Sequence, residues 1–490
     1  MNLTRRLLAV ALLAHLAVQV ALVRAPRFFA SEDDGYRLYQ AYLLCSGQAD
    51  PIGRFWLPGQ LALTCPALAA GVPPVWAGLA VSMLGLVLLA LALAALTRRL
   101  AGDGQGEQAG GAALVLVLAS PMAATLSHSA LAELPAMAAC ALAALGLLAR
   151  AQGAPISRLL GGTAAMLLAT WIRYESWPLA ALYPIAAGLA AGAGGQGQGR
   201  WRWRDALVAS LAWLGPLAWL LLQWQHYGDP LAFLHATADI TAQAGHAGVA
   251  RVLAHRLWAL VTWAPVPLLG GIVAALLIKR RAPFVFLAWM ALGVILPALG
   301  GDEHPTFPAR LAFGLEVGLV PLAALALARA AGARAPRPFA ALALLLVVLA
   351  PLVLARTRRP GFLDRDSVVV GLALRNGRLA PPAHGTLLVE RPEARPPLGW
   401  ASLASAWAEW SRIVFATPQA GTWELVMPTD VLADRWHVGD ADLGAWLDAH
   451  AVSAAWCVTP TCVKTLRVLW PEARVREIGR GRWLTRLAPP

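Results

Sequence analysis

Long runs of apolar residues are the feature that most restricts what this chain can fold into. A helix needs about 20 apolar residues to cross a bilayer, with a range of roughly 17–25. Only 14% of the 490 residues are charged, against about 25% in a soluble domain. We therefore expect a polytopic α-helical membrane protein. About eleven candidate spans follow one another, some at the short limit: 7–23, 73–97, 111–127, 129–149, 157–172, 174–190, 205–224, 257–278, 283–300, 311–331 and 338–355.

The basic residues predict the orientation of these spans, because cytoplasmic loops are enriched in Lys and Arg. With the N-terminus inside, the inside loops and span ends carry 15 basic residues and three acids. The outside ones, up to residue 355, carry eight basic residues and eleven acids. The N-terminus is therefore expected to be cytoplasmic. The first run also fits a cleaved signal peptide, and cleavage would leave the other spans as they are.

The net charge of +13 would also fit a nucleic-acid-binding protein. Here many of the basic residues lie in short loops between apolar runs, so no nucleic-acid partner is expected.

The composition changes after residue 355, which divides the chain into a transmembrane domain, 1–355, and a tail, 356–490. Short apolar runs at 386–389, 413–416 and 454–458 predict strands, and 398–410, 443–450 and 461–469 predict helices. Alternating strands and helices favour a small α/β domain, which the orientation of the spans places outside the cytoplasm.

Two cysteine pairs lie close in the sequence: Cys45 with Cys65, and Cys457 with Cys462. In an oxidising compartment each could be a disulfide, and free thiols are an equal alternative. Cys140 lies within a predicted span, where packing is its expected role.

Polar residues gather at span ends that all fall on the predicted outer face. Ionisable groups near the membrane are costly to bury and are usually functional. The clusters are 31–37, His128 with Glu133, 173–175, 226–230, and 301–305 with Arg310.

Each cluster also has a structural explanation. The acids of 32–34 could be a solvated surface, Glu133 could pair with a neighbouring helix, and Arg173 could extend to the interface. His226 and His304 could be hydrogen-bonded surface residues, and Asp229 could simply start a turn. The shared face is what favours a functional interpretation.

The chemistry of these groups is consistent with a substrate that is part lipid, part phosphate and part sugar. A carboxylate can act as a general base on a hydroxyl or hold a divalent cation, although no ligand spacing requires a metal here. Arginine binds phosphate through charge-assisted bonds, and aromatic rings can lie against a sugar or a lipid headgroup.

Five short motifs, in this order, resemble bacterial GT-C-type glycosyltransferases, the group of the protein O-mannosyltransferases and the aminoarabinose transferase of lipid A. They are Glu32-Asp33-Asp34-Gly35-Tyr36-Arg37, Trp56-Leu57-Pro58, the run from His128 to Pro135 that contains Glu133, Arg173-Tyr174-Glu175-Ser176-Trp177, and Tyr227 to Leu231. The chain departs from the aminoarabinose transferases in having Leu57-Pro58-Gly59 where they carry a Lys-Pro-Pro type segment. No lectin-like insertion of the eukaryotic mannosyltransferases is visible.

The resemblance implies a cell-envelope enzyme of the bacterial inner membrane that transfers a sugar from a polyprenyl-phosphate donor. The acceptor, a glycan, lipid or protein, would react at the outer face, with Asp33 or Asp34 as the base. The donor phosphate would be stabilised by Arg173, Arg310 or Arg37. The remaining expected substrate-binding residues are Glu32, Tyr36, His128, Glu133, Tyr174, Glu175, Asp229 and His304.

Two other function classes use similar parts. A transporter or flippase of lipid-linked sugars often shows internal repeats and binding groups near the midplane, whereas this sequence has no clear repeat and gathers its polar groups at one face. A structural protein of the envelope would tolerate replacement of the acidic loop. The sequence therefore favours the enzyme.

Overall fold

The computed structural model describes residues 3–24, 32–45, 56–102, 104–190, 202–244, 248–278, 281–299, 308–331, 345–346, 348–349, 352, 379, 386–390, 412–419, 421–427, 434–478 and 481–486. These residues fall into two compact units. One contains 1–30, 57–60 and 79–359, and the other contains 31–56, 61–78 and 360–490.

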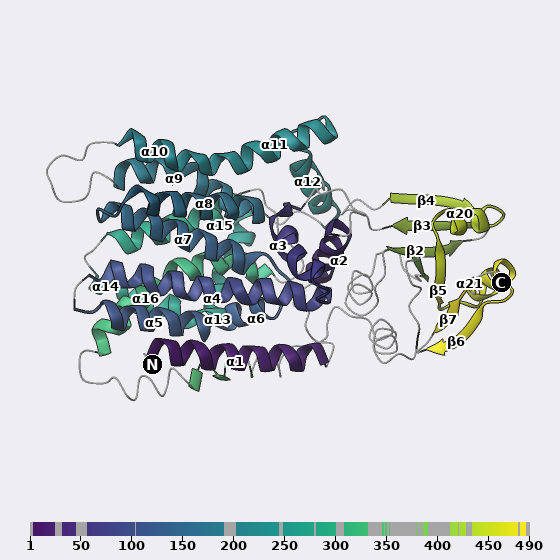
Figure 1. The fold of residues 1–490 in the computed structure, drawn as a ribbon, viewed down its shortest axis with the longest axis horizontal. Helices are drawn as coiled ribbons and strands as arrows, with labels where there is room; N and C mark the ends of the chain where they lie inside the picture. Colours follow the sequence, from purple (N-terminus) through teal and green to yellow (C-terminus); the bar gives the residue numbers. More distant parts are fainter. Residues whose placement is uncertain are drawn as a thin grey trace. The chain divides into compact units, whose positions relative to one another are not determined.

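Helices make up the membrane part (Figure 1). Their bounds are α1 Leu3–Arg24, α2 Glu32–Cys45, α3 Pro58–Ala69, α4 Pro74–Ala101, α5 Gly106–Leu118, α6 Pro121–Ser127, α7 Glu133–Ala151, α8 Ile156–Ile172, η1 Tyr174–Ser176, α9 Trp177–Ala190, α10 Trp203–Ser210, η2 Leu211–Trp213, α11 Leu214–Tyr227, α12 Ala232–Ala244, α13 Val249–Trp263, α14 Pro265–Leu277, α15 Ala282–Ala298, η3 Pro308–Ala312 and α16 Phe313–Ala331.

Four helical stretches within the described residues are long and apolar enough to cross a membrane: Val75–Ala101, Glu133–Ala151, Trp203–Tyr227 and Arg310–Ala330. Two bent helix pairs raise the number to six if each pair is one span, and α8, α15 and part of α1 are shorter apolar helices. Leucine and tryptophan side chains remain exposed on these helices, as a lipid-facing surface requires. The chain is an integral membrane protein; the count of eleven spans stays a prediction.

Two of the predicted spans are not continuous helices. The predicted span 111–127 is broken between α5 and α6, which meet at 60°, and 257–278 is broken between α13 and α14, which meet at 100°. In both, a proline begins the second helix: Pro121 in α6 and Pro265 in α14. Proline has no N–H to continue a helix but is well suited to starting one.

The acidic run after the first span is also different from its prediction. The sequence suggested a loop there, whereas helix α2 begins at Glu32. Carboxylates in the first turn of a helix are favoured by its dipole, which explains why the acids start a helix. The predicted span 338–355 lies almost wholly outside the described residues.

The C-terminal domain contains a sheet whose described strands follow the order β4-β3-β2-β1-β5-β7-β6. Their bounds are β1 Thr386–Glu390, β2 Arg412–Gln419, β3 Thr422–Met427, β4 Asp434–Gly439, β5 Val452–Cys457, β6 Arg474–Ile478 and β7 Gly481–Thr485. The central strand β1 is parallel to β2 and β5, in register Val389 with Phe415 and Trp456, and the other pairs are antiparallel. All five residues of β1 are buried, as expected for a strand covered on both faces.

Helices α20 (Leu443–Ala449) and α21 (Pro460–Leu469) pack into the core of this domain through Leu443, Leu447, Val463 and Leu466. The predicted strands at 386–389, 413–416 and 454–458 and the predicted helices at 443–450 and 461–469 are all present. The helix predicted at 398–410 lies outside the described residues. The predicted fold class, a helical membrane protein with a small α/β domain, is confirmed.

Both predicted cysteine pairs are disulfides: Cys45 with Cys65 and Cys457 with Cys462. Cys140 is a buried free thiol in α7.

Candidate active site

A short break between α6 and α7 determines where Glu133 lies. Residues 128–132 are buried but not helical, so their carbonyl groups need partners from elsewhere, because a buried unpaired carbonyl is costly. Side chains from three other helices provide partners for two of these carbonyls and for that of Ser127, the last residue of α6. The amide of Gln19 on α1 donates to Ser127 O at 2.8 Å, Gln60 on α3 donates to Ala130 O, and Ser82 on α4 donates to Leu131 O at 3.4 Å.

Two histidines add to this polar layer. His15 on α1 lies stacked against His128, with ring centroids 5.1 Å apart. His15 Nδ1 is 3.1 Å from Ser127 Oγ, and His128 Nε2 is 3.3 Å from the carbonyl oxygen of His15. Both side chains are fully buried. His128, a predicted substrate-binding residue, therefore holds α1 against the break.

The break ends at Glu133, the first residue of α7, where the helix dipole favours a negative charge. Arg173 Nη1 donates to Glu133 Oε1 at 2.5 Å. Arg173 also forms a bidentate pair with Glu175, in which Nε donates to Oε2 at 2.9 Å and Nη2 donates to Oε1. Arg310 Nε lies 3.6 Å from Glu133 Oε1.

These four residues, which we call the charged cluster, come from the start of α7 (Glu133), the residue after α8 (Arg173), η1 (Glu175) and η3 (Arg310). The Arg173, Glu133 and Arg310 side chains are 10% exposed or less. The guanidinium of Arg173 balances the negative charge of Glu175 through the bidentate pair.

The charged cluster lines a pocket together with apolar side chains that include Met137, Leu179, Met290, Val294 and Phe313. The pocket volume is about 20 Å³, room for roughly one water-sized group. Gly293 allows α15 to pack closely against η1, because a Cβ at this position would lie 2.8 Å from the backbone oxygen of Glu175.

One carboxylate oxygen in the charged cluster accepts no hydrogen bond from the part of the chain that the structure describes. Glu133 Oε2 is buried and accepts no hydrogen bond from the described residues. Buried polar atoms in a purely structural network are almost always hydrogen-bonded. Glu133 Oε2 therefore remains able to accept a further hydrogen bond at the edge of the charged cluster.

An aromatic group lies next to the charged cluster in the sequence. Tyr174 stacks on Phe233 of α12 with ring centroids 4.6 Å apart, and Trp177 meets Phe233 edge-on at 5.5 Å. Tyr174, predicted to bind substrate, therefore joins η1 to α12.

Asp229 makes the contacts expected of a residue that starts a turn. Its Oδ1 accepts from Leu231 N at 2.9 Å and its Oδ2 lies 2.7 Å from His235 Nδ1, which together form the turn into α12. The backbone hydrogen bond from Leu231 lowers the pKa of Asp229.

The residues predicted in the acidic run lie on α2. Asp34 and Arg37 are buried, and the Arg37 guanidinium lies 3.8 Å from the ring centroid of Trp56. The side chains of Glu32, Asp33 and Tyr36, and the whole of His304, lie outside the described residues. Of the predicted site residues, the structure brings together Glu133, Arg173, Glu175 and Arg310.

Several polar residues near the pocket were not predicted from the sequence. Arg256 on α13 is buried and donates to the carbonyl oxygen of Val294, a pocket residue. His15 and Gln19 stand four residues apart in the apolar α1, so they share one helix face. For α1, this pair of polar residues at helical spacing was the sequence signal that could have revealed the polar layer. For Arg256, the signal was the position of a charged residue within an apolar segment.

The architecture is shared with a known membrane protein. The chain is similar to ArnT from Cupriavidus metallidurans in the apo state, with a TM-score of 0.56 and 12% sequence identity over 97% of this chain and 99% of that chain. The likeness to the same protein bound to undecaprenyl phosphate has a TM-score of 0.58 and 13% identity over 98% and 97% of the two chains. No protein-family model and no curated protein sequence matches the chain. The chain therefore has the fold of ArnT over nearly its whole length, and its predicted likeness to the GT-C-type glycosyltransferases holds at the level of the fold.

Proposed function

We propose that this protein is a membrane glycosyltransferase that takes a sugar from a polyprenyl-phosphate donor and passes it to a hydroxyl of a glycan, lipid or protein. Two observations support the proposal: the ArnT-like fold, and the undecaprenyl phosphate bound to ArnT in one of the two similar structures. The observation that carries it is the charged cluster, in which two arginines meet at a pocket beside a carboxylate oxygen that accepts no hydrogen bond from the described residues.

In this proposal, Arg173 and Arg310 bind the phosphate of the donor and stabilise the negative charge that develops as it leaves. Glu175 orients the guanidinium of Arg173 through its bidentate pair. Glu133 Oε2 accepts a hydrogen bond from a hydroxyl of the donor sugar. A phosphate is larger than the pocket of about 20 Å³, so donor binding requires the cluster side chains to move apart.

The acceptor hydroxyl loses its proton to a carboxylate of α2, either Asp33 or Asp34, while its oxygen attacks the anomeric carbon. The bond from that carbon to the phosphate oxygen breaks, and the polyprenyl phosphate leaves with the electron pair. The positive-inside pattern supports an orientation with the N-terminus in the cytoplasm. The reaction and the C-terminal domain would then lie on the outer face of the bacterial inner membrane.

The test uses the purified full-length protein in liposomes with a panel of radiolabelled polyprenyl-phosphate sugars and candidate acceptors. Transfer of label to an acceptor, with release of polyprenyl phosphate, is the expected result. Arg310→Ala should weaken donor binding by about tenfold or more, the loss of roughly one charge-assisted bond. The matched control is Arg98→Ala, because Arg98 pairs with Glu107 at an exposed site.

The same liposome assay distinguishes a glycosyltransferase from a flippase. A flippase would move the labelled lipid between leaflets without forming a labelled acceptor. Movement without transfer, across the whole panel, would replace the enzyme proposal with the flippase.

A further inference from the structure

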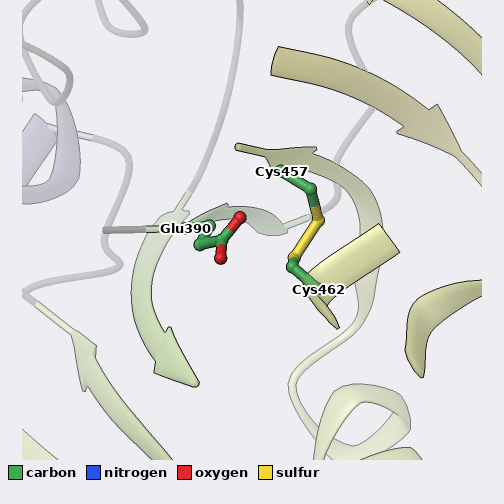
Figure 2. Close-up of side chains that lie close together, drawn as sticks. All are labelled: Glu390, Cys457 and Cys462. Atoms are coloured by element: carbon green, nitrogen blue, oxygen red, sulfur yellow. A yellow bond between two sulfur atoms is a disulfide. The ribbon is translucent and has the colours of Figure 1, made fainter. Parts of the chain in front are cut away.

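Three side chains of metal-ligand type meet in the C-terminal domain, and the proposed sugar transfer uses none of them. Glu390 is the last residue of β1, Cys457 is the last residue of the adjacent parallel strand β5, and Cys462 lies in the first turn of α21. All three are buried. Figure 2 shows the carboxylate end of Glu390 facing the two sulfur atoms.

The donor atoms are close enough to share one ion. One carboxylate oxygen and the two sulfurs all lie within 4.8 Å of one another. Four residues separate the cysteines, a spacing common in zinc sites, and thiolate with carboxylate is a donor set that zinc accepts.

Backbone geometry allows both cysteines to bind the same ion. Zinc holds two thiolates at about 2.3 Å with a tetrahedral angle, which places the sulfurs roughly 3.8 Å apart. The Cα atoms of Cys457 and Cys462 are 5.7 Å apart. Rotation about the Cα–Cβ bonds of the two cysteines changes the separation of the sulfurs while the backbone stays in place.

The hydrogen bonds of Glu390 orient its carboxylate and still leave a position for an ion. Oε2 accepts from Val458 N at 2.5 Å and from Thr459 N at 2.7 Å, and Oε1 accepts from the hydroxyl of Thr459. A carboxylate offers about four lone-pair positions, so the donors among the described residues use three of them. Such outer contacts are what fix a metal ligand in place.

The two sulfurs are joined as a disulfide in this structure, and in that state they cannot both bind an ion. We infer that Glu390, Cys457 and Cys462 form a redox-gated zinc site, closed when the cysteines are oxidised and open when they are reduced. A phosphine or dithiol reductant supplies two electrons that break the S–S bond. With a phosphine, one water molecule provides the oxygen of the phosphine oxide and the two protons that the sulfurs take up; with a dithiol, the two protons come from its own thiol groups. The reductant becomes a phosphine oxide or a cyclic disulfide. Binding of Zn²⁺ then displaces both thiol protons and leaves two thiolates and one carboxylate oxygen on the ion.

The test measures zinc bound to the full-length protein in detergent, with and without prior reduction by a phosphine under anaerobic conditions. After desalting, the reduced protein should retain about one zinc per chain and the oxidised protein almost none. Co²⁺ in place of zinc should give the intense near-ultraviolet absorption of a thiolate ligand.

Paired variants assign the zinc to this site. Reduction also opens Cys45–Cys65, so Cys45→Ser/Cys65→Ser is matched against Cys457→Ser/Cys462→Ser. The first pair should keep the zinc and the second should lose it. Glu390→Gln should weaken zinc binding by at least about tenfold, the loss typical even for outer contacts of a metal site.

Two results would overturn the inference. One is a reduced wild-type protein that retains no zinc and gives no thiolate absorption with Co²⁺, a measurement that does not depend on how any variant folds. The other is zinc retention by the Cys457→Ser/Cys462→Ser variant equal to that of the wild type.

Discussion

Arg173 joins two carboxylates through one planar guanidinium, with a bidentate pair to Glu175 and a single bond to Glu133. Arg173→Ala would leave the buried carboxylate of Glu133 and the partly buried carboxylate of Glu175 without their shared partner. Breaking a buried ion pair costs about 3–5 kcal/mol, so we expect a fall of that size in the free energy of unfolding, and weaker donor binding. Denaturant unfolding in detergent and donor titration would measure the two effects.

Arg173→Lys separates charge from shape in the same residue. Lysine keeps the positive charge but cannot reproduce the planar bidentate pair, so it should not restore donor binding. The exposed Arg98–Glu107 pair gives the scale for comparison, because exposed ion pairs contribute only about 0–1 kcal/mol. Donor binding by Arg173→Lys equal to that of the wild type would show that the charge at residue 173 is enough and would contradict a requirement for the guanidinium held by Glu175.

Asp33→Asn and Asp34→Asn remove a charge at nearly constant size. If one of these residues is the general base, its loss should lower the transfer rate by about 10²–10⁴-fold. Donor binding should change little, because the base acts on the acceptor. Radiolabel transfer measured beside donor titration would show whether the two effects separate.

The solvated-surface alternative predicts near-normal activity for both aspartate variants. Asp34 is buried in the structure, which already argues against that alternative for this residue. Near-normal turnover of both variants, when each is expressed and correctly inserted, would end the assignment of the base and favour the transporter.

At the scale of elements, the approach of α15 to η1 depends on a single glycine. Gly293→Ala would place a Cβ 2.8 Å from the backbone oxygen of Glu175, and overpacking of this kind costs about 1–3 kcal/mol. Gly161 is the matched control, because a Cβ at that position in α8 meets nothing within 4 Å. Gly161→Ala should raise the stability by roughly 0.5–1 kcal/mol, since alanine favours a helix.

Thermal unfolding in detergent would compare the two glycine variants. The expected result is opposite shifts, with a lower transition temperature for Gly293→Ala and a higher one for Gly161→Ala. Equal shifts would mean that the contact between Gly293 and Glu175 does not limit the packing of α15.

Hydrophobic runs and strand patterns predicted most elements, because burial in lipid or in a sheet selects local residue types. The two broken spans were missed because average hydropathy does not change at a break. The signal was local and present in the sequence: Ser120 caps α6 with Pro121 next to it, and Pro265 begins α14. In both broken spans, a proline inside an apolar run therefore marks the start of a new helix.

The charged cluster was predicted only in part. Counting the spans predicts one side of the membrane for Glu133, Arg173, Glu175 and Arg310. Their mutual contacts depend on how α7, α8 and η3 pack, which the span count does not predict. Nothing in the sequence indicated that Gln19 and Gln60 satisfy the carbonyls of the α6–α7 break. Such partners are more than 60 residues apart in the chain, and only tertiary packing brings them together.

At the scale of the whole molecule, the orientation in the membrane is the most direct test. A cysteine introduced at Arg202 should resist labelling from outside intact cells, whereas one introduced at the exposed Asp440 should react. The prediction rests on the excess of basic residues in the loops assigned to the inside. Labelling at Arg202 in intact cells would reverse the assignment and place the C-terminal domain in the cytoplasm.

The two outer strands of the sheet have a consequence for neighbouring copies of the protein. Strands β4 and β6 end the described sheet on either side, and an open edge can pair with an edge of another molecule. Arg474, Arg476 and Glu477 are exposed along β6, and charges on an edge strand oppose such pairing. Membrane proteins are confined to a plane, which raises their local concentration, so these charges protect the domain from intermolecular aggregation where encounters between copies are most frequent.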